Sequence, residues 1–216
     1  MMKAIKTLVL IVLLLIPTMN VHALDLIQPQ TDPECRYDEL RSENNQINFS
    51  VNGEPFIIES SFSMPNGLWM TGPGSNSYFE HSRKVEPRKG YIHITETFKN
   101  LTDQPLPLRQ RHTCDLATRA TKFWCAGRTN TSSIAESANP TSYAITATAG
   151  IGFMALSDAM QVHVRNSSSS GILGLADNEC VIPASGTYSA EWVIIPTQRP
   201  DFWDFVNASR RVRINS

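Results

Sequence analysis

Hydrophobic and polar residues alternate along residues 91–98, which predicts a β-strand with one apolar face. Residues 100–103, NLTD, follow as a turn whose short polar side chains can bond their own backbone. The chain resumes as QPLPL at residues 104–108, where two prolines favour an edge strand or an extended segment over the centre of a sheet. This strand–turn–strand unit indicates a β-sandwich.

The period of two recurs along most of the chain and predicts further strands. Asn52-Gly53 is a strong hairpin signal within residues 47–58, because a type I′ turn needs positive φ at both central positions. Residues 24–45, 60–87 and 166–170 are expected to be loops. Later strands are expected at residues 142–149, 151–156, 161–165, 171–175, 179–182 and 188–195. The pattern therefore predicts an all-β fold, an antiparallel β-sandwich over residues 24–200.

The C-terminal residues 201–216 depart from this pattern and follow a helical period. Phe202, Phe205 and Val206 share one face, and acids in the first turn suit the positive end of the helix dipole. Pro200 directly before the segment suits a helix start. We expect one amphipathic helix that docks on the sandwich through its aromatic face and leaves its arginines exposed.

Residues 1–23 predict a secretory signal peptide. Lys3 and Lys6 precede a short apolar run, and residues 21–23 fit a cleavage site after Ala23. The run is too short to cross about 30 Å of hydrocarbon. We therefore expect a secreted or periplasmic protein without a membrane span after cleavage. The net charge of −1 argues against a nucleic-acid partner, for which a basic surface is expected.

The chain has four cysteines: Cys35, Cys114, Cys125 and Cys180. In an oxidising compartment an even number usually indicates disulfides, and four cysteines allow three pairings. We favour Cys114–Cys125, because the residues between them could form a short excursion between strands; Cys35–Cys180 would then tie the N-terminal segment to a late strand. The alternative is a metal site, but no CxxC or HxxxH spacing supports it. We therefore expect no metal and no cofactor.

His112 is the first candidate catalytic residue. The segment NLTDQPLPLRQRH, residues 100–112, resembles the strand–turn–strand of galactose mutarotase-like supersandwich proteins, in which such a turn leads to a histidine that acts on a sugar ring. The resemblance implies a supersandwich-like fold with His112 as the general acid. The chain departs from that family in having His-Thr-Cys-Asp where His-Pro-Tyr-Phe is usual. The alternative is a structural histidine, hydrogen-bonded at the end of a strand.

Glu96 is the second candidate, because it falls on the apolar face of the 91–98 strand. A buried carboxylate must be paired or neutral, and a carboxylate pair can serve glycoside hydrolysis. The alternative is a structural ion pair with Arg109 or Arg111 on the neighbouring strand.

The C-terminal segment is similar to one in large secreted bacterial proteins related to glycoside hydrolases. In those proteins a β-sandwich ends in a tryptophan-bearing strand, and a D-[FYW]-W-x-F-[VI]-N-x-x-R-R helix leads into a catalytic barrel. The matching residues here are Trp192, Pro196, Asp201, Trp203, Phe205, Asn207, Arg210 and Arg211. The resemblance implies a non-catalytic module whose partner would be a catalytic barrel encoded separately.

Trp69, Tyr78 and Phe79 are candidate ligand-binding residues, because aromatic rings can stack on pyranose faces; buried aromatics that close one end of the sandwich are the alternative. Three functions remain open. The favoured one is a secreted, non-catalytic module that binds carbohydrate or another protein. The others are a mutarotase-like enzyme that uses His112, and a structural envelope protein.

Overall fold

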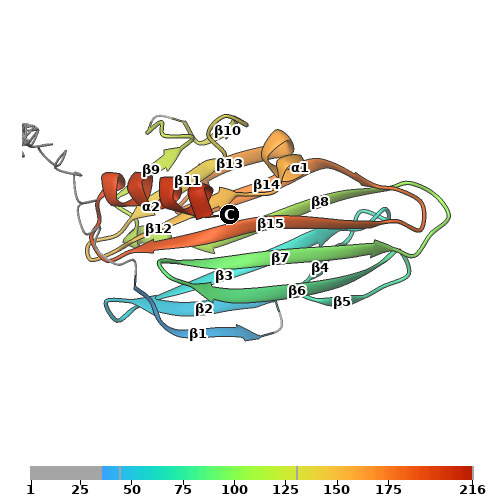
Figure 1. Cartoon of the computed structure of the whole chain (residues 1–216), viewed down its shortest axis with the longest axis horizontal. Coiled ribbons are helices and arrows are strands. Elements are labelled where there is room, and N and C mark those ends of the chain that lie inside the picture. Colours follow the sequence, from blue (N-terminus) through green and yellow to red (C-terminus); the bar gives the residue numbers. More distant parts are fainter. Residues whose placement is uncertain (1–35, 44, 130, 216) are drawn as a thin grey trace, which may run out of the picture. The chain divides into compact units, whose positions relative to one another are not determined.

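The computed structural model describes residues 36–43, 45–129 and 131–215. The predicted signal peptide, its cleavage site and Cys35 lie outside this range. The described residues form two antiparallel β-sheets, here called sheet A and sheet B (Figure 1). The predicted all-β sandwich with a C-terminal helix is confirmed.

Sheet A has eight strands among the described residues. In order across the sheet they are β1 (Asp38–Glu43), β2 (Gln46–Val51), β3 (Glu54–Ser63), β8 (Leu106–Asp115), β14 (Ile172–Ile182), β13 (Val164–Ser169) and β10 (Ser133–Ala135), with β4 (Trp69–Thr71) paired to β3. Sheet B has seven described strands. Their order is β5 (Gly74–Ser75), β6 (Phe79–Arg88), β7 (Tyr91–Asn100), β15 (Thr187–Thr197), β12 (Gly150–Ala155), β11 (Thr141–Ile145) and β9 (Lys122–Cys125).

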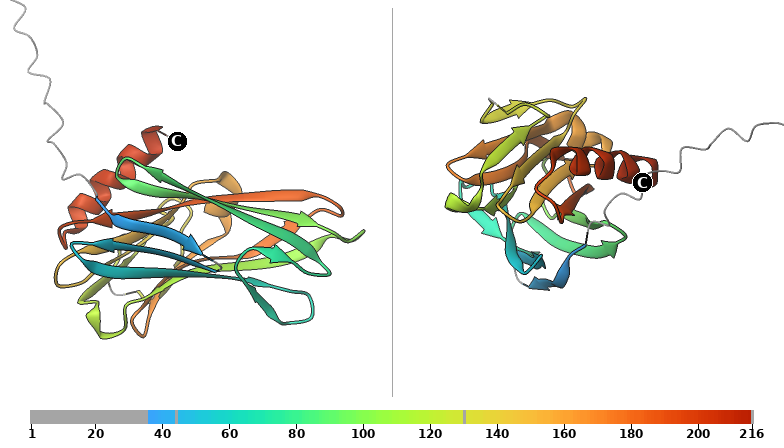
Figure 2. Two further views of the ribbon diagram at one scale, coloured as in Figure 1. Left: turned by 90° about the horizontal axis from the view of Figure 1, so that it is seen from below. Right: turned by 90° about the vertical axis from the view of Figure 1, so that its left-hand side faces the viewer.

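The two sheets pack face to face and bury the apolar face of each strand (Figure 2). The largest apolar cluster joins residues of sheet A, such as Ile58 and Leu175, to residues of sheet B, such as Ile94 and Trp192. A second cluster, around Phe62, Phe98 and Leu108, fills the interior farther along the same strands. Full burial of such side chains contributes about 1.5–3 kcal/mol each, which makes these clusters the main stabilising feature of the fold.

The C-terminal helix α2 (Phe202–Asn215) lies on the outside of sheet B, against β11, β12 and β15 (Figures 1 and 2). Phe205 is 2% exposed and stacks on Tyr143 with ring centroids 4.5 Å apart. A Cβ atom on Gly152 would overlap the Phe205 ring, so the absence of a side chain at this position lets the helix approach the sheet. The predicted docking of the helix through its aromatic face is confirmed, but the expectation that all its arginines are exposed is wrong for Arg211, which is half-buried.

Several predicted boundaries are wrong. Residues 60–87 are not one long loop, because β3 continues to Ser63 and β6 begins at Phe79. The inward positions of β6 include His81 and Arg83, so the strand lacks the apolar alternation that identified the others. Residues 24–45 are not wholly a loop either, because β1 pairs with β2.

The expected strand at residues 161–165 is also wrong in its first half. These residues continue a short helix, α1 (Asp158–His163), with an acid in its first turn, and Gln161 donates a hydrogen bond back to the Leu156 carbonyl. The serine-rich segment after it is strand β13, not a loop. The polar side chains hid its period of two. A 3-10 turn, η1 (Ala117–Arg119), links β8 to β9. None of the described helices is long and apolar enough to cross a membrane.

Candidate functional site

A group of polar side chains lies inside the sandwich, between the two apolar clusters. We call it the polar layer. Its members occupy inner-face positions of six long strands: Ser60 (β3), His81 and Arg83 (β6), Glu96 (β7), Gln110 and His112 (β8), Asp177 (β14) and Tyr188 (β15). On each of these strands the neighbouring inward residues on one or both sides are apolar. The polar layer therefore crosses the middle of a hydrophobic core.

Glu96 is the centre of this layer and is completely buried. His81 Nε2 lies 2.7 Å from Glu96 Oε2, and Arg83 Nε donates to Glu96 Oε1 at 2.9 Å. The register pairs Arg83 directly with Glu96 across β6 and β7. The expected structural partner, Arg109 or Arg111, is wrong, because both arginines alternate with inward residues on β8 and point away from the core.

The surroundings keep Glu96 ionised. Burial by itself raises the pKa of Glu96, but the hydrogen bond with His81 and the charge of Arg83 outweigh it, so the pKa is lowered. An ion pair of this kind is costly to bury and costly to break. Glu96 is therefore a fixed negative charge inside the fold.

His112 lies next to Glu96, as the enzyme hypothesis requires, with 3.8 Å between His112 Nδ1 and Glu96 Oε1. Its Nδ1 is 2.9 Å from the Ser60 hydroxyl and its Nε2 is 3.3 Å from Gln110 Oε1, while the ring stacks on Trp192 at 4.2 Å. Burial lowers the pKa of His112 to about 3, despite the opposing effect of the Glu96 charge. The imidazole is therefore neutral near pH 7, and its two ring nitrogens are hydrogen-bonded to Ser60 and Gln110.

The other half of the polar layer is less well satisfied. The Gln110 amide nitrogen, Asp177 Oδ2 and the Tyr188 hydroxyl have no well-aligned hydrogen-bond partner among the described residues, although Gln110 lies close enough to affect the pKa of both other groups. Burial raises the pKa of Asp177, which limits the cost of leaving this carboxyl in the core.

The polar layer brings the predicted residues His112 and Glu96 together, but both have 0% exposure. A general acid must come within hydrogen-bond distance of the reacting atom. No substrate can reach these two side chains while the sheets remain packed. The described residues also contain no group of three or more His, Cys, Asp or Glu placed to hold a metal ion.

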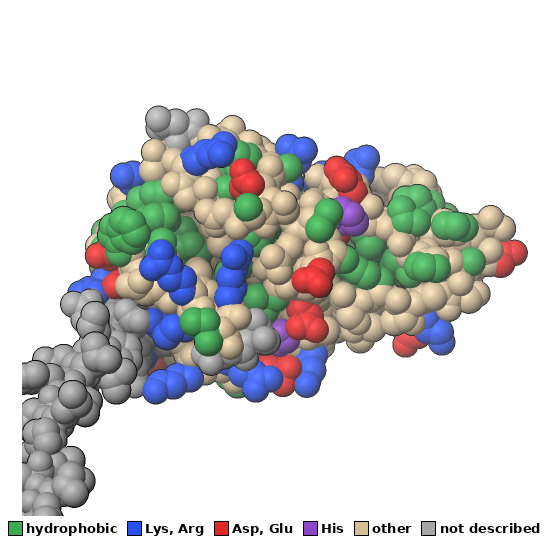
Figure 3. Space-filling view, turned by 45° about the horizontal axis from the view of Figure 1, so that its top comes forward, with side chains coloured by type: hydrophobic (Ala, Val, Ile, Leu, Met, Phe, Trp, Pro, Cys, Tyr) green, Lys and Arg blue, Asp and Glu red, His purple; other side chains and the backbone are tan. Residues whose placement is uncertain are grey.

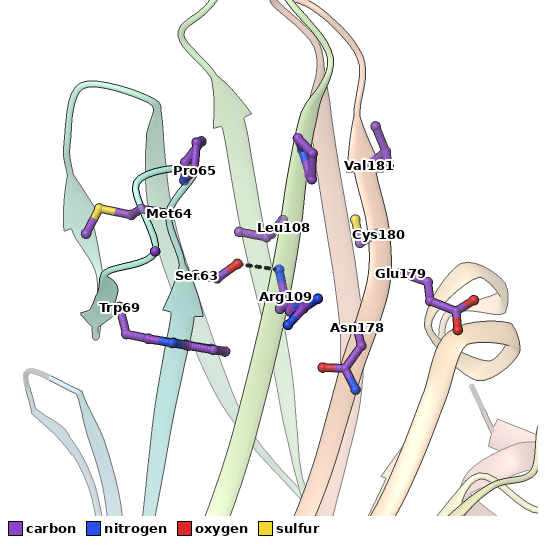
Figure 4. Close-up of a pocket in the computed structure, with 12 residues that line it drawn as sticks. Ser63, Met64, Pro65, Trp69, Leu108, Arg109, Asn178, Glu179, Cys180 and Val181 are labelled. Atoms are coloured by element: carbon purple, nitrogen blue, oxygen red, sulfur yellow. Dashed lines mark hydrogen bonds between the residues drawn. The ribbon is translucent and has the colours of Figure 1, made fainter.

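An open pocket lies on the opposite, outer face of sheet A. We call it the Trp69 pocket (Figure 4). Its volume is about 490 Å³, within the size range of small-molecule sites. Its polar side chains come from neighbouring strands, and its floor and walls are otherwise apolar. Its lining includes Ser63, Trp69, Pro107, Arg109, Asn178 and Glu179.

Two breaks in strand pairing create this pocket. The pairing of β3 with β8 ends at Phe62 and Gln110, and Pro107, farther along β8, has no N–H to extend it. Beyond that point the Arg109 amide donates to the Ser63 hydroxyl at 2.8 Å, which caps the gap. β8 is central in sheet A, so the prediction of an edge strand at residues 104–108 is only partly correct. The start of β8 is unpaired on the side that faces β3, whereas its other side pairs with β14.

The second break is a β-bulge in β14, where the register shifts between Asp177 and Cys180. The extra residue re-aims the strand, as bulges commonly do beside functional sites. Asp177 stays inside, while Asn178 and Glu179 line the pocket from the outside (Figure 4).

Trp69 extends from β4 across β3 toward β8 (Figure 4). The serines at positions 61 and 63 have small side chains, which leave room for the indole over β3. The Arg111 guanidinium lies 4.2 Å from the centre of the Trp69 ring. The contact is a cation–π interaction that holds both side chains at the margin of the pocket.

The expected aromatic platform needs correction. Trp69 lines the pocket, but Phe79 is completely buried in the second apolar cluster, and Tyr78 packs against that cluster. Phe79 is the first residue of β6 and the first of its inward-facing positions, so its ring enters the core. Tyr78 directly precedes it and packs against the same cluster. Of the three, Trp69 is the one available to a ligand in this pocket.

The expected disulfides also need correction. Cys114, Cys125 and Cys180 are free, buried thiols, and Cys35 lies outside the described residues. Cys114 is on β8 of sheet A and Cys125 is on β9 of sheet B, so the segment between them passes from one sheet to the other. Burial raises the pKa of the Cys114 thiol to about 12, which makes it unreactive.

Sequence reasoning missed His81 and Arg83, the partners of Glu96, and gave Arg109 and Arg111 the wrong role. A signal for the arginines was present. Arg109 and Arg111 alternate along β8 with the positions of Leu106 and Leu108. Because the leucines mark the inward face, the arginines must lie on the outward face.

Fold and site together define an all-β sandwich with a sealed polar interior and an open pocket on one sheet face. No protein-family model matches the sequence, and no curated protein matches it. Among solved structures, a mutant of the heparan sulfate lyase HepC from Pedobacter heparinus is similar with TM-score 0.38 and 10% identity, over 77% of this chain and 22% of that chain. The Slr1438 protein from Synechocystis sp. PCC 6803 is similar with TM-score 0.42 and 11% identity, over 76% of this chain and 66% of that chain.

At this level of similarity neither protein defines a function for this chain. The chain spans 22% of the lyase it matches, and the resemblance to a module of a larger secreted enzyme stays a prediction. The weaker resemblance to mutarotase-like proteins also stays a prediction.

Proposed function

We propose that this chain is a non-catalytic β-sandwich module that binds carbohydrate through the Trp69 pocket. The observation that carries this proposal is the contrast in access between two sets of polar residues. The pocket is open and combines an aromatic ring with a guanidinium, an amide and a carboxylate, the groups that sugar hydroxyls and ring faces require. The histidine and carboxylate that chemistry would use are sealed inside.

The burial of His112 argues against the alternative enzyme. A mutarotase-like general acid must reach the sugar to exchange a proton with it, but His112 is completely buried, and its lowered pKa keeps the imidazole neutral near pH 7. Its contacts with Ser60, Gln110 and Trp192 account for its position without a catalytic role.

A second candidate function is protein interaction through α2. Trp203 is 64% exposed and Ile214 is 81% exposed, although Phe205 on the same helix is buried. On the face drawn in Figure 3, hydrophobic side chains gather near basic ones on the part of the surface that α2 forms. Such a surface could contact a separately encoded catalytic domain, the partner that the C-terminal resemblance implies. Co-purification of the chain with such a domain, lost in Trp203→Ala, tests this candidate.

Export through the predicted signal peptide is part of the proposal, because polysaccharides are met outside the cytoplasm. Fractionation of the host cells tests it. Recovery of the uncleaved chain in the cytoplasm would contradict export.

Affinity electrophoresis tests carbohydrate binding directly. The mature protein is run through native gels that contain dextran, xylan, polygalacturonate or dextran sulfate. We expect at least one polysaccharide to retard the wild type, and Trp69→Ala to migrate as if the polysaccharide were absent. Trp203→Ala is the matched control, because it removes an exposed tryptophan outside the pocket.

Two results would overturn the proposal. One is the absence of retardation by every polysaccharide; the other is equal retardation of the Trp69 variant and the wild type. For the enzyme alternative, polarimetry of fresh α-glucose measures anomer interconversion, and we expect no acceleration by the protein.

A further inference from the structure

We infer that the ligand of the Trp69 pocket is an anionic saccharide, whose carboxylate or sulfate groups are bound by arginines on the outer face of sheet A. The inference rests on the proposed function and names the chemical class of its ligand. The arginines are Arg109 and Arg111 on β8 and Arg165 on β13, all exposed.

The first observation is that none of these arginines is neutralised by the fold. Among the described residues, no carboxylate lies within ion-pair distance of Arg109, Arg111 or Arg165. Other arginines of the chain do have such partners, as Arg83 has Glu96, Arg119 has Glu54 and Arg199 has Asp204. Three arginines without a carboxylate partner on one sheet face each contribute positive charge that can attract an anion.

The second observation is their register. Arg111 pairs with Ala176 on β14, and Ala176 pairs with Arg165 on β13, so the two arginines flank a small residue in one row across the sheet. Strand spacing places their Cα atoms about 10 Å apart, with the Ala176 methyl between them. An exposed arginine therefore lies on each side of Ala176 in this row. Arg109 lies two residues along β8, about 7 Å from Arg111, and extends the row into the pocket.

The third observation is the support of Arg111 by Trp69. With its guanidinium 4.2 Å from the indole centre, Arg111 is held in place, and less conformational entropy is lost when it binds a ligand. A guanidinium matches the paired oxygens of a carboxylate or sulfate with two parallel hydrogen bonds. Because Arg111 lies against the indole, a neutral sugar would have to displace it to stack on that side of the ring, whereas an acidic sugar would bind it.

The expected attraction of anions belongs to the arginines of this sheet face and not to the whole surface of the protein. The chain has a net charge of −1, so a polyanion is not attracted by the molecule as a whole. Glu179 borders the pocket from β14, with its carboxylate drawn on the side away from Trp69 (Figure 4), and its negative charge opposes anion binding. Its removal is therefore a useful test, since Glu179→Gln should strengthen binding of an anion.

Two matched pairs of polysaccharides test the inference by isothermal titration calorimetry. Dextran sulfate is compared with dextran, and polygalacturonate is compared with its fully methyl-esterified form. We expect the charged member of at least one pair to bind about tenfold tighter or more than its neutral counterpart, with affinity that falls as salt is raised. Preference within the first pair identifies sulfate as the bound group, and preference within the second identifies carboxylate.

Variants locate the binding to the arginine row. We expect Arg111→Ala to weaken binding about tenfold or more, Arg111→Lys to weaken it less, and Glu179→Gln to strengthen it. Arg210→Ala is the matched control, because Arg210 is an exposed arginine on α2, outside the patch. Its affinity should remain within about twofold of the wild type.

The outcomes are separable. If neutral polysaccharides bind as tightly as the charged ones and Trp69→Ala abolishes that binding, the inference fails and the proposed function stands. If Arg210→Ala weakens binding as much as Arg111→Ala, the attraction is non-specific and the inference fails. If no polysaccharide binds, both fail.

Discussion

The polar layer and the Trp69 pocket use the two faces of the same strands and have opposite properties. On β8, Gln110 and His112 point into the core, while Arg109 and Arg111 point out. The inner residues contact one another and are inaccessible; the outer ones are exposed and the chain supplies them with few partners. A step of one residue along a strand thus separates a buried histidine from an exposed arginine that we propose binds the ligand. Access to solvent, more than residue type, distinguishes the two regions.

The largest effect is expected from breaking the polar layer. Glu96→Ala leaves Arg83 and His81 buried without their anion, and loss of one partner from a buried ion pair costs about 3–5 kcal/mol. Urea denaturation followed by circular dichroism measures this change in the free energy of unfolding. Glu179→Ala, on the pocket side, is the control and should change it by less than about 0.5 kcal/mol. Similar small effects for both variants would contradict the distinction.

Acid should destabilise the protein through the polar layer. The unfolded pKa of histidine is near 6.5, and the folded pKa of His112 is lowered to about 3. Between these values the unfolded chain binds a proton that the folded chain does not, so stability falls as pH decreases, by up to about 1.4 kcal/mol per unit. Glu96, whose pKa is also lowered, adds a loss in the same direction below about pH 4.3.

Urea titrations at a series of pH values measure this dependence. His112→Gln should show a shallower decline than the wild type between about pH 6 and pH 4.5, where the carboxyl of Glu96 contributes little. An unchanged slope in this variant would mean that His112 is not the buried neutral group.

A smaller loss of stability is expected from Gly152→Ala. The added methyl would overlap the Phe205 ring, and overpacking of this kind typically costs about 1–3 kcal/mol. The substitution touches neither the polar layer nor the pocket. It therefore separates stability from binding. Thermal melting should show a lower Tm. Affinity electrophoresis with the polysaccharide that retards the wild type should show unchanged binding. Loss of binding in this variant would mean that the binding assay reports stability.

The smallest effect on stability is expected at the pocket. Trp69→Ala removes the contact with Arg111, worth about 0.5–1 kcal/mol at an exposed site. The Tm should therefore change little while saccharide binding is lost. A fall in stability as large as that of Glu96→Ala would show that Trp69 is a core residue.

The sequence allowed the fold class to be predicted because most strands have apolar inward positions, as in residues 91–98. Strand β6 was missed because two of its inward positions hold polar residues, His81 and Arg83. These residues belong to the polar layer, and their residue types do not indicate a buried face. The inward position of Glu96 could be inferred from its own strand, but its partner could not. That partner depends on the register of β6 against β7, a non-local property.

The pocket was beyond sequence reasoning for a similar reason. Trp69 could be named as a ligand-binding candidate from its residue type. Its position beside Arg111 depends on the pairing of β4 with β3, and the wall opposite depends on the bulge between Asp177 and Cys180. Local patterns do not specify such relations between strands.

The central claim is that ligand binding belongs to the outer face of β8 and not to the histidine inside it. The most direct measurement is the calorimetric affinity for the tightest-binding polysaccharide, compared between Arg111→Ala and His112→Gln, with folding of both variants verified by circular dichroism. The account predicts a loss of about tenfold or more for Arg111→Ala and a change within about twofold for His112→Gln. Loss of binding in folded His112→Gln, with unchanged binding in Arg111→Ala, would contradict it.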